Sequence, residues 1–167
     1  MEASLTLRAA VAGDLDAVMA IERRPGFEDW VGRSSAEEHR AMMDDANTAY
    51  LVGEVDVGMV AFAILRNLDD PHGNRYLKRV AVARPNEGIG YIFLERVVDW
   101  TFNCAGAHRF WLDCFSHNAR AQRVYEKLGF TRDGVLREAY LDADGVRRDL
   151  TMMALTRPQW VERGARP

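Results

Sequence analysis

Short stretches of alternating apolar and polar residues, or of β-branched and aromatic residues, predict the strands of this protein. Alternation predicts a first strand over 5–9. Runs of β-branched and aromatic residues predict two further strands between 49 and 65, joined at Asp56 as in an antiparallel hairpin. Residues 67–74 have the composition of a loop, and 76–83 follow as another strand. The first half of the chain is therefore expected to build most of a sheet.

Apolar residues that recur every three or four positions predict four helices, over about 13–21, 36–45, 90–104 and 118–128. Ser35 and Glu38 have the spacing of a capping box, which predicts where the second helix begins. The third helix is expected to bury one apolar face, made of Ile92, Phe93, Val97 and Trp100.

The order of elements in the second half predicts a parallel pair of strands. A strand ending near 83, a loop over 84–90, a helix and a strand over 109–115 make a βαβ unit, whose crossover places its two strands parallel. Two more strands flank DADG at 142–145, an Asp-Gly turn signal. We therefore expect residues 1–167 to form a single α/β domain. Its mixed sheet should have about seven strands, antiparallel at both ends and parallel in the middle, with about four helices.

Composition and charge exclude several classes of protein. Apolar residues make up 48% and charged residues 28% of the 167 residues, which is typical of a globular protein and excludes general disorder. A net charge of −3 gives no overall attraction to nucleic acid or to an anionic membrane. No stretch approaches the ~18 apolar residues of a membrane span, and MEASLTLRAA lacks the pattern of a secretory signal. These observations predict a cytoplasmic protein.

The cysteines and histidines give no sign of a metal site or a disulfide scaffold. Cys104 and Cys114 have no CxxC partner, so both are expected to be buried free thiols. No metal is expected, because metal-ligand spacing is absent from all four histidines, His39, His72, His108 and His117.

The loop RPNEGIG, residues 84–90, leads into the third predicted helix with Gly88 and Gly90 on either side of Ile89. The first amides of a helix lack partners within it, and the helix dipole favours an anion beside them. Glycine lets a ligand approach the backbone closely. A phosphate site and a plain connection both fit this loop, which is neither a Walker loop nor a full GxGxxG.

The stretch NARAQRVYEKLGF, residues 118–130, has the spacing of a short amphipathic helix. Asn118 is a good N-cap, and Gly129 fits the C-terminal end of the helix. Tyr125 lies on the apolar stripe, so it is either a packing residue or a proton donor. Asn118 lies two helical turns from it, which lets both side chains face one groove. The opposite side of this helix carries three basic residues, Arg120, Arg123 and Lys127, which suit a solvated surface or a cofactor phosphate.

These two motifs together resemble the acyl-CoA-binding core of the GNAT superfamily of N-acetyltransferases, especially its ribosomal-protein N-terminal acetyltransferase branch. The resemblance covers nearly the whole chain, and the pattern N-x-x-A-x-x-x-Y-x-x-x-G-F is its more specific part. The loop departs from the family at Pro85, where Gln or Arg is common three residues before the first glycine. That change removes a side chain able to orient the loop, although the backbone donors remain.

The resemblance implies a site for acetyl-CoA between two central parallel strands that splay apart. The pantetheine arm would lie along the first of these strands and the pyrophosphate on the loop. Asn118 would contact the arm of the cofactor, and Tyr125 would sit near its sulfur. The strand and loop residues implied in binding acetyl-CoA are Val80, Ala81, Val82, Glu87, Gly88, Ile89, Gly90 and Tyr91.

The chemistry of amide formation explains why a tyrosine is suited to this place. A neutral amine attacks a thioester, and the thiolate that leaves needs a proton. A phenol with an ordinary pKa of about 10 is protonated at neutral pH, so Tyr125 can supply it. Asp113 occupies a strand position where related enzymes often carry a glutamate proposed as the base, and it can equally be a structural residue. Glu28 and Asp29 are rival bases in a loop that borders the acceptor site in the family, and Trp30 would wall that site.

We expect direct attack in a ternary complex, because neither cysteine lies in a motif for a covalent step, with acetyl-CoA and an amine acceptor as partners. The protein is expected to be a monomer or homodimer. The acceptor expected from the closest branch is the N-terminus of a protein or peptide. A small-molecule amine, such as an antibiotic or an amino-acid analogue, is the first alternative. A non-catalytic module that binds acyl-CoA is the second.

Overall fold

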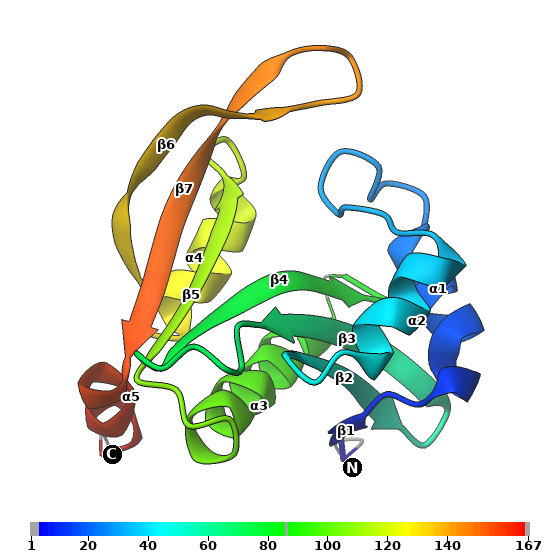
Figure 1. Cartoon of the computed structure of the whole chain (residues 1–167), viewed down its shortest axis with the longest axis horizontal. Coiled ribbons are helices and arrows are strands. Elements are labelled where there is room, and N and C mark those ends of the chain that lie inside the picture. The colour runs from blue at the N-terminus through cyan, green and yellow to red at the C-terminus, as the bar shows by residue number, and fades with distance from the viewer. Residues whose placement is uncertain (1–3, 86, 166–167) are drawn as a thin grey trace.

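The computed structural model describes residues 4–85 and 87–165, which form a seven-stranded sheet with helices on both faces (Figure 1). The strands are β1 (Thr6–Ala9), β2 (Thr48–Val55), β3 (Gly58–Arg66), β4 (Asn74–Val82), β5 (Arg109–Phe115), β6 (Thr131–Leu141) and β7 (Arg147–Thr156). The helices are η1 (Ala12–Asp14), α1 (Leu15–Glu22), α2 (Ala36–Asp44), α3 (Ile89–Asn103), α4 (Ala119–Lys127) and α5 (Arg157–Gly164).

The strands lie in the order β1-β2-β3-β4-β5-β7-β6, and every neighbouring pair is antiparallel except β4 and β5. This arrangement confirms the mixed sheet with one parallel pair in its middle. The two predicted hairpins are also confirmed, with β2 and β3 joined through Asp56 and β6 and β7 joined through the DADG turn. Local sequence patterns therefore identified both the strands and most of their partners.

The parallel pair stays together for only three residues before its strands diverge. Asn74, Arg75 and Tyr76 of β4 pair with β5 at Arg109–Trp111, and no later residue of β4 does. A bulge in β4 lies just past this point, because β3 pairs with Leu77 and then with Arg79, which leaves out Lys78. A bulge bends its strand and re-aims the side chains that follow. Figure 1 shows the result, a V between β4 and β5 that opens away from α5.

Two apolar clusters hold helices against opposite faces of the sheet. On one face α1 and α2 pack Val18, Ile21 and Met42 onto β2 and β3. On the other face α3 buries Phe93 and Val97 completely, within a larger cluster that also includes Tyr125 and Leu128 from α4 and its C-terminal end. Because α4 joins this cluster, its position next to the V is fixed by the core.

Details of the buried faces correct two expectations. Ile92 is 43% exposed, and the buried stripe of α3 runs instead through Phe93, Leu94, Val97 and Val98. The predicted stripe was therefore rotated by about one residue, since the sequence does not show how a helix is turned on its sheet. The cysteines are also not both buried, because Cys104 is exposed at the end of α3 and Cys114 is half-buried on β5.

The sequence analysis missed α5, which follows β7 directly. Thr156 and Gln159 form a capping box at its start, and Pro158 occupies its first turn. These signals were present in the sequence but followed a strand without any loop. Trp160 of α5 stacks on Phe102 of α3 with 5.1 Å between ring centroids, which ties the end of the described chain to the core. None of the helices in the described residues is long and apolar enough to span a membrane.

Candidate active site

The V between β4 and β5 opens into a cavity of about 820 Å³. Its floor carries Val80 of β4, Asp113 of β5 and Tyr125 of α4. One wall is the α1–α2 loop, defined as residues 23–35, and the other is the hairpin tip, defined as residues 140–148. Seven residues singled out from the sequence line this one cavity, namely Glu28, Asp29, Trp30, Val80, Asp113, Asn118 and Tyr125.

Tyr125 reaches the cavity from the buried stripe of α4. The Oδ1 atom of Asn118 accepts a hydrogen bond from the Ala121 amide at 3.1 Å, which confirms the predicted N-cap and fixes the start of the helix. Tyr125 is only 8% exposed, and its ring packs 5.9 Å from that of Phe130. Burial raises the pKa of Tyr125 above its usual value, and nearby Cys114 and Asp113 add to the effect. The phenol therefore stays protonated at neutral pH.

Asp113 is held by a tyrosine that the sequence analysis did not single out. The Tyr76 hydroxyl donates a hydrogen bond of 2.9 Å to Asp113 Oδ2, across the V from β4 to β5. The Tyr76 ring stacks on Trp111 with centroids 4.1 Å apart. Burial, followed by Asp113, raises the pKa of Tyr76 above its usual range, so its hydroxyl remains a donor. Only the register of the parallel pair, which sequence does not reveal, brings these two residues together.

Cys114 borders the same floor but has the properties of an unreactive thiol. Its Sγ lies 3.9 Å from the Thr151 carbonyl oxygen, and burial raises the pKa of the thiol to about 11. The thiolate, rather than the thiol, is the nucleophilic form of cysteine. Cys114 is therefore poorly suited to carry an acetyl group at neutral pH.

The edge of β4 that faces the V has backbone groups to offer. Val80, Ala81 and Val82 pair with β3 on one side, and on the other side these three residues have no strand partner among the described residues. The side chain of Ala81 is buried in the core, so only its backbone can contact a ligand. An extended ligand such as a pantetheine arm can hydrogen-bond to an open strand edge in the way that an added strand does.

The loop predicted to bind phosphate ends at the N-terminus of α3, beside β4. Gly88 is the N-cap residue with a φ of 77°, and no side chain caps this end of the helix. A Cβ on Gly88 would meet nothing within 4 Å, whereas one on Gly90 would lie 3.4 Å from Val82 Cγ1. Gly88 is thus open to a ligand, whereas Gly90 packs against β4. These features fit the pyrophosphate of a CoA molecule, which is an anion that helix amides can bind.

The remaining loop residues and the basic side of α4 lie near this end. Glu87 is exposed, with a carboxylate oxygen 4.0 Å from Arg84, and Ile89 and Tyr91 are in the first turn of α3. Lys127 of α4 lies over the Tyr91 ring, 5.4 Å from its centroid. The binding roles of Glu87, Gly88, Ile89, Gly90 and Tyr91 stay predictions.

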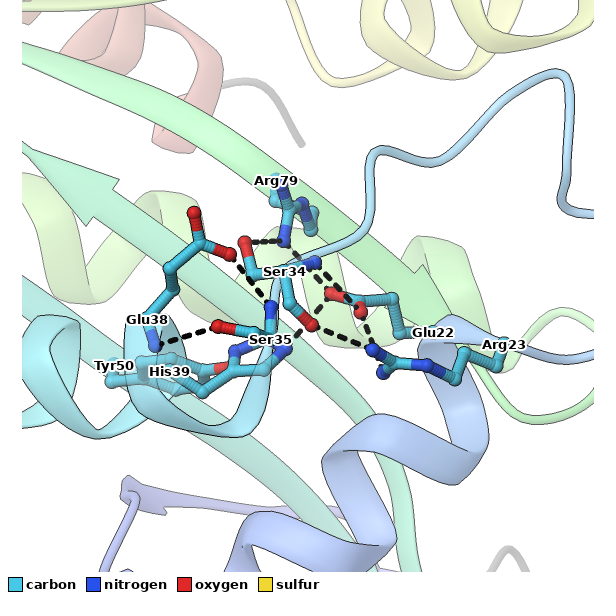
Figure 2. A network of polar contacts seen from close by, with 8 residues as sticks. All are labelled: Glu22, Arg23, Ser34, Ser35, Glu38, His39, Tyr50 and Arg79. Atoms are coloured by element: carbon cyan, nitrogen blue, oxygen red, sulfur yellow. Dashed lines mark hydrogen bonds and ion pairs between the residues drawn. The ribbon is translucent and has the colours of Figure 1, made fainter. Parts of the chain in front are cut away.

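A buried polar network behind the cavity anchors the α1–α2 loop (Figure 2). Glu22, at the end of α1, has no exposed surface and receives hydrogen bonds from Arg79 at 2.8 Å, Arg23 at 2.9 Å and the Ser34 amide at 3.1 Å. Arg79 also donates to Ser34 Oγ at 3.0 Å, and Arg23 to the Ser34 carbonyl at 2.7 Å. Both ends of the loop are therefore tied to β4, the strand that borders the V.

His39 and Tyr50 extend this network into the core. The Tyr50 hydroxyl and His39 Nδ1 are 2.7 Å apart and share a hydrogen bond. His39 Nε2 lies 3.0 Å from Glu22 Oε2, but a hydrogen on that nitrogen would not point at the carboxylate, so the contact is close without being a hydrogen bond. Burial, and then Glu22, raises the pKa of Tyr50 above its usual range. The Ser35–Glu38 capping box at the start of α2 is confirmed and completes the anchor.

Aromatic side chains connect the two walls across the cavity. The Trp30 ring lies 5.3 Å from that of His117 and 6.5 Å from that of Phe115, and Phe115 in turn lies 5.0 Å from Tyr140 on the hairpin tip. These contacts support the prediction that Trp30 walls the cavity. His117 and Tyr140 were missed, because a link between loops distant in sequence leaves no local pattern.

Comparison with known proteins decides the family. Residues 15–130 match the acetyltransferase (GNAT) family. The chain belongs to this family. The protein is thus an acetyl-CoA-dependent N-acetyltransferase acting on an amine, as the resemblance implied. Within residues 4–85 and 87–165, no group of three or more His, Cys, Asp or Glu side chains is placed to hold a metal ion.

Two relatives of this GNAT protein differ in their acceptors. The spermidine N(1)-acetyltransferase of Vibrio cholerae is 22% identical over 173 residues, which covers 98% of this chain and 99% of that enzyme. The [ribosomal protein bS18]-alanine N-acetyltransferase of Escherichia coli is 36% identical over 69 residues, which covers 41% of this chain and 45% of that enzyme.

Solved structures confirm the GNAT fold along most of the chain. The Vibrio cholerae spermidine N-acetyltransferase in complex with CoA and spermine superposes with a TM-score of 0.82 at 20% identity, covering 94% of this chain and 98% of that one. The Escherichia coli ribosomal-protein-S18-alanine N-acetyltransferase gives 0.76 at 26% identity, covering 92% and 94%. The fold is shared with both, so the fold alone does not decide the acceptor.

Proposed function

We propose that this protein transfers an acetyl group from acetyl-CoA to the α-amino group of a protein or peptide N-terminus. The observation that carries the choice of acceptor is the similarity to the enzyme named for an alanine of ribosomal protein bS18, at 36% identity over 69 residues. Alanine has no amine in its side chain, so N-acetylation of an alanine at a chain end occurs on the α-amino group. We therefore propose an α-amino group as the acceptor of this protein as well.

Binding of the donor follows from the open edge of β4 and the start of α3. The pantetheine arm would bond to the backbone of Val80 and Val82, and the pyrophosphate would lie on the amides that follow Gly88. Asn118 lines the cavity beside this path. The thioester would then reach the floor beside Tyr125, and the acceptor would enter between the α1–α2 loop and the hairpin tip.

Tyr125 serves as the proton donor to the leaving group. The amine nitrogen bonds to the acetyl carbon, the carbon–sulfur bond breaks, and the sulfur takes the proton of the Tyr125 hydroxyl. A raised pKa keeps this phenol protonated until the sulfur becomes negative. Attack is direct, because Cys114 is a thiol of raised pKa that is a poor carrier of an acetyl group.

Asp113 serves as the general base, through a water molecule. Its carboxylate faces the cavity and is oriented by Tyr76, which is how a base is held in a productive position. Glu28 is the weaker candidate, because hydrogen bonds from the amides of Glu28 and Gly26 lower its pKa and leave it a poorer proton acceptor. Asp29 lies on the same exposed loop, farther along the wall.

The energetics of deprotonation favour an α-amino group. At pH 7.4 an α-amino group with a pKa near 7.8 loses its proton at a cost of about 0.5 kcal/mol, whereas a lysine amine with a pKa near 10.4 costs about 4 kcal/mol. A single carboxylate acting through water is enough for the first cost.

A second candidate function, acetylation of a small polyamine, is favoured by the full-length alignment to the spermidine enzyme and by carboxylates on both walls, Glu28, Asp29 and Asp144.

An acceptor screen tests the proposal. Three acceptors are compared at equal concentration with acetyl-CoA: a peptide with a free N-terminal alanine, the same peptide with a blocked N-terminus and one lysine, and spermidine. Release of CoA thiol and the mass of each product are measured. We expect the free N-terminus to give a kcat/KM at least tenfold above the other two. Preference for spermidine would establish the second candidate instead.

The Tyr125→Phe substitution tests the chemistry separately from the acceptor. Loss of the proton donor should lower kcat about 100-fold or more, with little change in KM for acetyl-CoA. A rate unchanged between pH 6 and 9 would show that Tyr125 only packs. Thermal stabilisation by CoA, measured on both proteins, confirms that the donor still binds, and its absence at saturating CoA would contradict the assigned donor site.

A further inference from the structure

Lys78 is an unusual residue for this chain. The sequence has 22 lysines and arginines, of which only Lys78 and Lys127 are lysines. Arginine stays protonated in proteins and is no nucleophile at neutral pH, whereas a lysine amine can lose its proton and react. The cavity of an acetyltransferase therefore contains one of the two side-chain amines in the chain that can accept an acetyl group.

The bulge in β4 sets the place of Lys78. Because β3 pairs with Leu77 and then with Arg79, Lys78 is the extra residue at the point where β4 leaves β5. It is exposed and lines the cavity together with Asp113 and Tyr125. Its side chain makes no hydrogen bond or ion pair with the described residues, so no contact there holds the amine away from the floor.

The charges that face Lys78 come from four elements. Burial of part of the side chain, Arg79 on β4 and Arg66 on β3 lower the pKa of Lys78, and Asp113 on β5 and Glu38 on α2 oppose them. The balance is a lowered pKa, so more of the amine is neutral at pH 7 to 8 than in a free lysine. Asp113, the proposed base, is thus within electrostatic range of both the Lys78 amine and the Tyr125 hydroxyl.

We propose that Lys78 is a site of self-acetylation, modified when acetyl-CoA is bound and no acceptor is present. The Lys78 nitrogen bonds to the acetyl carbon, the carbon–sulfur bond breaks, the sulfur takes the Tyr125 proton, and the proton lost by nitrogen passes to Asp113 or to water. The products are an acetyl-lysine and free CoA. The inference rests on the proposed function, because it needs the thioester to lie beside Tyr125.

Acetylation of Lys78 would act back on the enzyme. It removes a positive charge and adds an acetyl group to the cavity where the acceptor must enter. Turnover of the acceptor should therefore fall as Lys78 is modified, and a saturating acceptor should protect Lys78. Lys127 provides the internal control, because its amine lies over Tyr91 on the outer side of α4 and does not line the cavity.

Intact-protein mass and peptide mapping test the proposal on the full chain incubated with acetyl-CoA alone. The unmodified chain and Lys127→Arg should each gain one acetyl group, located on Lys78, with a rate constant that is independent of protein concentration. Lys78→Arg should gain none, and Tyr125→Phe should react at least tenfold more slowly. Circular dichroism and the thermal midpoint of each variant confirm that it is folded.

Other results would overturn the inference. Equal labelling of Lys127, or a rate on Lys78 that Tyr125→Phe leaves unchanged, would mean uncatalysed acetylation by the thioester. The same samples are also given the peptide with a free N-terminal alanine. Self-acetylation would be refuted, while the proposed function stands, if the enzyme acetylates the peptide but leaves Lys78 unmodified when no peptide is present. Failure of both reactions would refute both proposals.

Discussion

The α1–α2 loop is tied to the sheet by buried charges, whereas the hairpin tip that faces it across the cavity projects from an exposed strand. Glu22 and His39 have no exposed surface, and Glu22 joins Arg79, Arg23 and the Ser34 amide (Figure 2). On the other wall β6 is exposed along almost its whole length and lies at the edge of the sheet. One wall is thus fixed by the core, and the other by local contacts.

A bulge in β6 accounts for the bend of the hairpin. Leu136 pairs with Leu150 and Tyr140 with Arg148, so residues 137–139 of β6 oppose only Asp149 of β7. Within this bulge Glu138 has a φ of 52°, and its amide donates a hydrogen bond of 2.7 Å to Asp149 Oδ1. Figure 1 shows the tip of the β6–β7 hairpin turned over the V. The difference between the walls predicts that stability and acceptor binding are coupled in the loop but separable in the hairpin.

Glu22→Gln should have the largest effect on stability and on acceptor KM, because the NH₂ group of glutamine would face buried N–H groups that need an acceptor. The amide group of glutamine would point its NH₂ at Arg79 or Arg23 and remove the charge that compensates them. Breaking a buried ion pair in this way typically costs about 3–5 kcal/mol. At about 2–4 °C per kcal/mol for a chain of this size, the thermal midpoint should fall by about 10 °C. Acceptor KM should also rise at least about tenfold, with KM for acetyl-CoA unchanged, because the wall moves.

Asp14→Asn is the matched control for Glu22→Gln. Asp14 is a largely buried carboxylate that accepts hydrogen bonds from Arg8 at 2.7 Å and from the Val11 amide at 2.8 Å, and it does not line the cavity. Its loss should lower the thermal midpoint and leave acceptor KM unchanged. An equal rise in acceptor KM in both variants would mean that destabilisation alone is responsible, and the loop would have no special role.

Gly32→Ala tests the same wall with a single methyl group. A Cβ on Gly32 would lie 3.0 Å from Arg79 Nη2, and Arg79 cannot move freely because Glu22 and Ser34 hold it. Overpacking of this kind should cost about 1–2 kcal/mol in the free energy of unfolding and shift Trp30 relative to the cavity. Gly13→Ala is the control, since a Cβ there meets nothing within 4 Å. Chemical denaturation of both variants, with acceptor KM measured alongside, decides the outcome.

The sequence predicted most of the fold because each element carries its own local pattern. Alternation, runs of β-branched and aromatic residues and an Asp-Gly turn signal together found the strands, and the N-cap residues Ser35 and Asn118 were confirmed by their hydrogen bonds. The rotation of α3 and the exposure of Ile92 could not be predicted in this way, because they depend on how the helix packs on β2, where Gly53 leaves room for Phe93.

The residues of the site could be predicted only where they belong to one continuous sequence motif. The motif at 118–130 placed Tyr125 and Asn118 correctly in the cavity. The Tyr76–Asp113 hydrogen bond and the Glu22–Arg79 pair join residues 37 and 57 positions apart, so no local spacing could reveal them. The bulge at Lys78 also depends on register, since its sequence reads as an uninterrupted strand.

Asp149→Ala tests the hairpin wall. The substitution removes the acceptor for the Glu138 amide in an exposed bulge, so the cost should be about 1 kcal/mol in the free energy of unfolding. Acceptor KM should nevertheless rise several-fold, because Tyr140 and Arg148 are on the tip that this contact bends. Asp149 itself does not line the main cavity. A large loss of stability together with a raised acceptor KM would mean that both walls are held alike.

Glu138→Gly should have the smallest effect and the opposite sign. A non-glycine residue at a φ of 52° is strained by about 1–2 kcal/mol, and glycine removes that strain while losing about 0.5–1 kcal/mol to the entropy of the unfolded chain. The net result should be a gain of about 0.5 kcal/mol with acceptor KM unchanged, because the amide still reaches Asp149. Glu138→Ala, which removes the same carboxylate but keeps the Cβ, should gain nothing. A loss of stability in both variants would show that the Glu138 side chain, rather than its backbone, holds the bulge, and the hairpin would then depend on a side-chain contact as the loop does.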